Sequence, residues 1–142
     1  MKSDGKHAEV TELIIRAFYT VYNTLGYGFL EKVYRRAMII ELSKLGLQAI
    51  EEAAIQVYYD GQIVGNFSAD ILVADKVIVE TKSKRTLLEE HEAQLLHYLK
   101  STICEVGLLL NFGTEPQVKR KVYDNDRKGG LSWTKMAQIN AG

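Results

Sequence analysis

Apolar residues recur every three or four positions in three stretches of the chain, which is the spacing of one buried face of an α-helix. These stretches cover about residues 7–25, 30–45 and 86–102. Gly26 follows the first stretch and Gly46 follows the second. Glycine adopts the backbone angles that end helices. The pattern therefore predicts three helices, two of which lie before all the predicted strands.

Short segments rich in Val and Ile predict strands at residues 48–59, 62–73, 77–82, 105–111 and 117–123. The short connections between the first three favour an antiparallel meander, and Asp60-Gly61 is a strong hairpin signal. The third predicted helix then crosses over, in a right-handed sense, to a strand parallel to the third strand. We therefore expect an α/β domain with helices covering a mixed sheet.

The chain has 142 residues, of which 46% are hydrophobic and 25% charged, as in an ordinary globular domain. We expect this domain to cover residues 1–123 and a polar, glycine-punctuated tail to cover 124–142. The 18 Lys and Arg balance the 18 Asp and Glu, so nucleic-acid binding must depend on local basic clusters. The candidates are Lys82 with Lys84 and Arg85, Lys119-Arg120-Lys121, and Lys32 with Arg35 and Arg36; the plain alternative for each is a solvated face.

The single cysteine, Cys104, cannot form an intramolecular disulfide and suits a reducing compartment. The first residues are polar and do not resemble a signal peptide, and no apolar run approaches membrane-spanning length. We expect a soluble cytoplasmic protein without a membrane partner. The sequence makes no prediction of oligomeric state.

Asp70, Glu80 and Lys82 lie in segments rich in Val and Ile, where a buried carboxylate is costly unless it is paired or binds a metal. A three-residue turn over 74–76 would place Asp70 opposite Glu80 on one face of the sheet. A two-residue turn would place them on opposite faces. Glu80 and Lys82 share a face in either case, because side chains alternate along a strand.

Two neighbouring carboxylates favour a divalent cation, and Mg²⁺ commonly takes one or two carboxylates together with water and substrate phosphate. Such an ion orients a phosphodiester and makes a bound water more acidic. The Lys82 ammonium would then stabilise the nucleophile and the transition state. Mn²⁺ is a possible substitute. The plain alternative is a cross-strand salt bridge from Lys82 to Asp70 or Glu80.

The third predicted helix carries Gln94 and Tyr98 one turn apart, with His91 one turn earlier. Gln94 would hold a water or a phosphate oxygen, and Tyr98 would contact a phosphate or stack on a base. For His91 we favour an ordinary place on the helix flank. Glu31 begins the second helix, where the helix dipole explains a carboxylate, and it can also approach the metal through a water.

The run Gly28-x-x-Glu31-x-x-Tyr34 resembles the signature of the GxxExxY proteins, a family within the PD-(D/E)XK nuclease-like superfamily. The resemblance covers about residues 8–123, and Gln94-x-x-x-Tyr98 is similar to the helix motif of RecB-type nucleases. It implies a restriction-endonuclease-like αβββαβ core with a magnesium site. The implied metal ligands are Asp70, Glu80, the Thr81 backbone and, through water, Glu31. Lys82 would be the catalytic lysine, and Gln94 and Tyr98 the supporting pair.

The chain departs from the family pattern at three positions: Ser68 stands where arginine is usual, Tyr22 where histidine is usual and Tyr27 where proline is usual. We predict a metal-dependent nuclease, a phosphodiester hydrolase acting on DNA or RNA. The alternative is a non-catalytic module that keeps the nuclease fold and binds nucleic acid or a phosphorylated ligand. Ser68 and the neutral net charge favour this alternative. A third possibility is an interaction protein whose acids form salt bridges.

Overall fold

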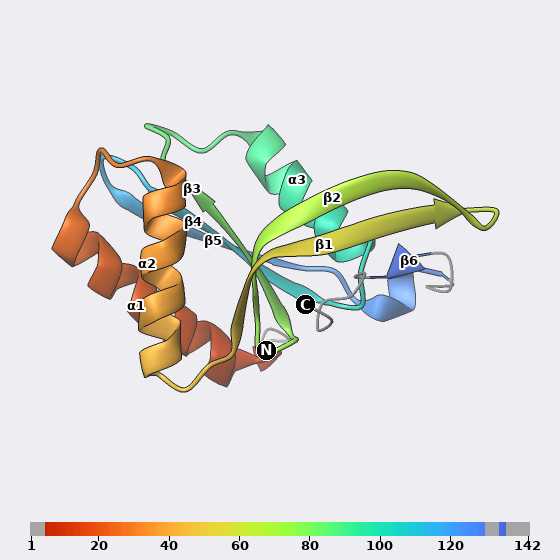
Figure 1. The fold of residues 1–142 in the computed structure, drawn as a ribbon, viewed down its shortest axis with the longest axis horizontal. Coiled ribbons are helices and arrows are strands. Elements are labelled where there is room, and N and C mark those ends of the chain that lie inside the picture. Colours follow the sequence, from red (N-terminus) through yellow and green to blue (C-terminus); the bar gives the residue numbers. More distant parts are fainter. Residues whose placement is uncertain (1–4, 130–133, 136–142) are drawn as a thin grey trace.

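The computed structural model describes residues 5–129 and 134–135. The predicted order of helices and strands is confirmed, with small shifts at the element ends (Figure 1). The elements are α1 (Ala8–Leu25), α2 (Glu31–Lys44), β1 (Ala49–Tyr59), β2 (Gln62–Val73), β3 (Val77–Lys82), α3 (Glu89–Lys100), β4 (Val106–Phe112), β5 (Pro116–Val122), a short 3-10 helix η2 (Asn125–Arg127) and β6 (Thr134–Lys135).

The strands form one mixed sheet in the order β5-β4-β3-β2-β1-β6. β1, β2 and β3 make the predicted antiparallel meander, and β3 pairs in parallel with β4 after the α3 crossover. The fold is therefore the predicted α/β, restriction-endonuclease-like architecture. β6 lies within the predicted tail and pairs with β1. The end of the domain at residue 123 stays a prediction.

Helices cover both faces of the sheet. α1 and α2 pack on one face through a core that includes Phe18, Tyr34 and Phe112, all fully buried. α3 packs on the other face through Leu95, which approaches β4 so closely that its Cδ1 lies 2.7 Å from where a Cβ on Gly107 would be. A side chain at 107 would force the Leu95 side chain to move. Among the described helices none is long and apolar enough to cross a membrane.

β1 and β2 bend sharply at Glu52 and at Asp70. Glu52 has a left-handed backbone with φ of 54°, an uncommon conformation for a residue other than glycine. Ala69 belongs to the core under α3, whereas Ile71 belongs to the core under α1 and α2. Residues two apart face the same side of a regular strand, so the strand twists between them. Beyond the bend, β1 and β2 leave the sheet as a long hairpin (Figure 1).

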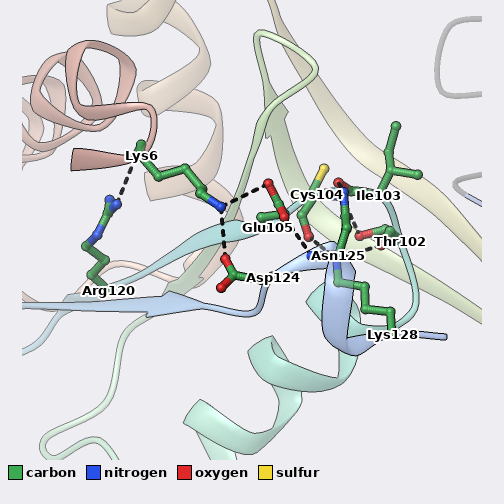
Figure 2. Close-up of polar contacts among 9 residues, drawn as sticks. All are labelled: Lys6, Thr102, Ile103, Cys104, Glu105, Arg120, Asp124, Asn125 and Lys128. Atoms are coloured by element: carbon green, nitrogen blue, oxygen red, sulfur yellow. Dashed lines mark hydrogen bonds and ion pairs between the residues drawn. The ribbon is translucent and has the colours of Figure 1, made fainter. Parts of the chain in front are cut away.

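The residues that follow β5 pack against the loop between α3 and β4 (Figure 2). The amide of Asn125 donates to Glu105 Oε2 at 2.6 Å. The buried ammonium of Lys128 donates to the carbonyl oxygens of Thr102, at 2.9 Å, and Cys104, at 2.8 Å. The chain up to Lys128 is therefore held to the sheet by hydrogen bonds.

Candidate active site

The bend separates β2 from β3 at the two predicted acids. The predicted register is confirmed from the turn up to the pair Ile71 and Val79, where the ladder ends. One step further, the Asp70 amide donates to Glu80 Oε2 at 2.8 Å, while the Thr81 amide and hydroxyl donate to Asp70 Oδ2 at 2.8 and 3.0 Å. Each carboxylate therefore accepts a main-chain hydrogen bond from the opposite strand, which in a regular sheet a carbonyl of its own strand would accept. We call Asp70 and Glu80 in this arrangement the crossed pair.

Burial in this arrangement disfavours the charged form of Glu80. Glu80 is 3% exposed, and burial followed by the charge of Asp70 raises its pKa to about 8. The Asp70 amide and the charge of Lys82 act in the opposite direction without cancelling this effect. In the described part of the chain, Lys82 makes no ion pair with either acid, so the salt-bridge alternative is not found.

The loop before α2 is held by Tyr34. Its hydroxyl donates to the carbonyl of Gly26 and accepts from the amide of Phe29, and its ring stacks on Phe112 at 4.2 Å between centroids. Gly28 has φ of 121°, which other residues rarely adopt. The glycine and tyrosine of the Gly-x-x-Glu-x-x-Tyr run thus have structural roles that fix the start of α2.

Glu31 is brought to the edge of the site by this loop. The Ser83 hydroxyl, just after β3, donates to the carbonyl of Phe29 at 3.0 Å and ties the loop to the end of that strand. The charge of Glu31 contributes to the raised pKa of Glu80, after the larger effects of burial and Asp70. Glu31 therefore lies within electrostatic reach of the acid pair, and its role as a metal ligand through water stays a prediction.

α3 places Tyr98 beside the acids. Tyr98 is 6% exposed, and burial, followed by the charges of Glu80 and Asp70, raises its pKa to about 12. Gln94 is exposed one turn earlier and makes no hydrogen bond to any described residue. His91 accepts a 2.9 Å hydrogen bond from the main chain at the start of α3, a structural role as favoured from the sequence.

Arg35 is a site residue that the sequence indicated only as part of a basic cluster. Its Nε donates to Glu51 Oε2 at 2.7 Å, and its side chain is 14% exposed. Burial lowers the pKa of Arg35, but Glu51 and then Asp70 raise it above its ordinary value. Arg35 follows Glu31 by one helical turn on α2, and this spacing is the signal that would have found it.

The donor set suits a hard divalent cation. Within the described ranges, no group of three or more His, Cys, Asp or Glu residues is arranged to hold a metal. Asp70 and Glu80 nevertheless offer two carboxylates, and burial together with the charge of Asp70 raises the pKa of Glu80. Mg²⁺ commonly binds one or two carboxylates and keeps several waters, so the pair fits it. The Thr81 backbone as a ligand stays a prediction.

A comparison with protein-family models decides the family. The model of the PD-(D/E)XK nuclease superfamily matches residues 8–122, which include Glu31, Asp70, Glu80, Lys82 and Tyr98. The chain belongs to this superfamily. Membership in this nuclease superfamily indicates nucleic acid as the class of substrate. The comparisons with curated proteins and with solved structures gave no match.

Proposed function

We propose that the chain is a divalent-metal-dependent nuclease of the GxxExxY group, which hydrolyses phosphodiester bonds in DNA or RNA. The observation that carries this proposal is the crossed pair Asp70 and Glu80. Each carboxylate accepts a 2.8 Å hydrogen bond from the main chain of the opposite strand, and neither is compensated by an ion pair with a described cation. Buried carboxylates without such compensation are unfavourable for folding alone. A bound cation would compensate the charge of the two carboxylates.

Asp70 and Glu80 would hold Mg²⁺, or Mn²⁺ in its place, with the Thr81 backbone and a water on Glu31 as further ligands. When bound, the ion would orient the phosphodiester and make a coordinated water more acidic. Lys82 lies on the same face of β3 as Glu80, so its ammonium would stabilise negative charge that develops on the phosphate.

Two further side chains would contact the substrate phosphate. Tyr98, with a pKa near 12, keeps its proton at neutral pH and would donate a hydrogen bond. Arg35 uses its Nε for Glu51, so its two terminal nitrogens face no described acceptor and would donate to phosphate oxygens. Gln94, at the surface of α3, would hold a water or a phosphate oxygen further out.

The test is cleavage of a panel of single-stranded DNA, duplex DNA and RNA with Mg²⁺, with Mn²⁺ and with chelator. We expect divalent-ion-dependent cleavage that is lost in Glu80→Ala and in Lys82→Ala. Lys76→Ala, in the exposed turn at the opposite end of β3, is the control and keeps activity. No cleavage above background on any substrate would reject the nuclease.

The second candidate is a non-catalytic module that binds nucleic acid or a phosphorylated ligand. Ser68, exposed on β2 two residues before Asp70, favours it because the family pattern usually has arginine at this position, and a phosphate contact is lost with that arginine. Binding that persists in chelator, with no product formed in Mg²⁺ or Mn²⁺, would select this candidate. For either function we propose a cytoplasmic location, which is supported by a single, buried cysteine, Cys104.

A further inference from the structure

A cavity of about 640 Å³ lies between α3, the end of β5 and η2. Three cations from these three elements line it: Lys100, Lys121 and Arg127. Among the described residues, no acidic one belongs to the lining, although Glu92 forms an ion pair with Lys121. The whole chain has zero net charge, so this cluster is a local feature rather than part of a generally basic surface.

The cavity also offers flat aromatic surface. The guanidinium of Arg127 lies over the ring of Tyr123, 4.5 Å from its centroid. Lys100 is exposed and makes no ion pair with any described residue. A ligand that combines negative charge with flat rings would therefore complement this hollow.

Aromatic side chains connect the cavity to the acid pair. The ring of His97, which forms part of the cavity wall, lies 5.7 Å from the ring of Tyr98 and 4.7 Å from that of Phe67. Phe67 is 40% exposed. The ring of Phe67 also lies 6.2 Å from that of Tyr98, and the charges of Glu80 and Asp70 act on Tyr98. The rings of Tyr98, Phe67 and His97 therefore form a path between the acid pair and the cations.

We propose that this path binds a single strand of nucleic acid, with bases stacked on Phe67 and His97 and a backbone phosphate held by Lys100, Lys121 and Arg127. The inference rests on the proposed nuclease function and adds the strandedness of the substrate. Sites for single strands combine a cationic groove with exposed aromatic rings, because unpaired bases have free faces to stack.

A simpler role accounts for only part of the cluster. Lysines on an edge strand prevent sheets from pairing edge to edge, and β5 is an edge strand that carries Lys119 and Lys121. This role does not explain Lys100 on α3 or Arg127 on η2, which line the same hollow. Binding of an anion explains all three cations that line it.

The experiment measures the affinity of the full chain, in chelator, for a labelled single-stranded oligonucleotide and for a duplex of the same length. The test variants are K100Q/R127Q and Phe67→Leu. The matched control is R16Q/K76Q, which removes the same charge from positions on α1 and on the β2–β3 turn, away from the path. Equal thermal midpoints for the variants establish that all of them fold.

We expect K100Q/R127Q to weaken single-strand binding about tenfold and to lower the salt slope by about 0.7 for each phosphate that is no longer neutralised. Phe67→Leu weakens it about fivefold or more because the bases stack less well. The control stays within about twofold, because charges far from the path neutralise no phosphate. Duplex binding changes less than single-strand binding in each test variant.

Unchanged single-strand affinity in both test variants, or an equal loss for the duplex, would overturn the inference. So would the absence of any oligonucleotide binding by the wild-type chain in chelator, even if cleavage occurs with metal. If the variants lose affinity as expected while no substrate is cleaved with Mg²⁺ or Mn²⁺, the binding path stands and the nuclease proposal fails.

Discussion

The main-chain amide of Asp70 donates a hydrogen bond of 2.8 Å to Glu80 Oε2, so one acid of the site positions the other. This bond fixes the place of the Glu80 carboxylate, yet burial and the charge of Asp70 still raise its pKa to about 8. The main chain therefore fixes the position of the Glu80 carboxylate, and a bound cation would compensate its charge.

Glu80 should make the metal-free protein less stable as the pH rises. Its folded pKa of about 8 exceeds the ordinary value of 4.5, so the folded state binds more protons than the unfolded state between these values. The free energy of unfolding then falls with increasing pH across that window. Glu80→Gln removes this fall, and at pH 8 we expect it to be more stable than wild type by on the order of a few kcal/mol.

Urea unfolding in chelator at pH 5 and at pH 8 checks this expectation. Glu115→Gln, in the exposed turn between β4 and β5, is the control and should follow the wild type at both values. A Glu80→Gln protein whose stability changes between the two pH values by the same amount as that of the wild type would contradict it.

Tyr34→Phe should loosen the start of α2. It keeps the ring on Phe112 but removes the hydrogen bonds to Gly26 and Phe29, at a cost of about 1–3 kcal/mol in the free energy of unfolding. Metal-dependent cleavage should fall as well, because Glu31 loses its fixed position. Denaturant unfolding and cleavage rates measure both effects, and Tyr19→Phe, on an exposed ring of α1, should leave both unchanged. If Tyr34→Phe and Tyr19→Phe have the same stability and the same cleavage rate, the Tyr34 hydroxyl does not fix the start of α2.

The sequence predicted the acid pair because it depends on local information. A three-residue turn over 74–76 fixes the register between β2 and β3, and alternation then places Glu80 and Lys82 on one face. The bend did not follow from the sequence, since Glu52 is not a glycine and a φ of 54° is uncommon for other residues.

The sequence likewise did not predict the position of Arg35 or the basic cavity. The ion pair between Arg35 and Glu51 joins a helix to a strand 16 residues later, and no short pattern encodes it. The cavity gathers Lys100, Lys121 and Arg127 from three elements, and the sequence indicated only the residues around Lys121. Long-range packing, rather than periodicity, decides both features.

Arg35→Gln should slow single-turnover cleavage about tenfold or more, because a charge-assisted hydrogen bond to phosphate is removed. Arg36→Gln is the matched control: Arg36 lies 3.5 Å from the same Glu51 oxygen, but its side chain is 61% exposed, against 14% for Arg35. We expect the control to stay within about twofold. If Arg35→Gln and Arg36→Gln slow cleavage equally, the slower rate comes from the lost ion pair with Glu51 and not from a contact between Arg35 and phosphate.

Lys128→Met tests whether the chain beyond residue 123 stabilises the domain. The buried ammonium donates hydrogen bonds to the carbonyls of Thr102 and Cys104. Its removal leaves both carbonyls without this donor, which should lower the free energy of unfolding by about 1–3 kcal/mol. Lys44→Met, whose side chain is 65% exposed, should change stability by about 0.5 kcal/mol or less. Thermal unfolding of both variants provides the comparison, and a wild-type midpoint for Lys128→Met would contradict a stabilising role of the Lys128 ammonium.

If the crossed acids Asp70 and Glu80 hold a divalent ion, Mn²⁺ bound there should broaden the signals of nearby amides by paramagnetic relaxation. The amides of Asp70 and Thr81 donate to the two carboxylates, so the account predicts that their signals broaden first in wild type. It also predicts that this selectivity disappears in Asp70→Asn with Glu80→Gln. Broadening that begins elsewhere, or that survives unchanged in the double variant, would contradict the account.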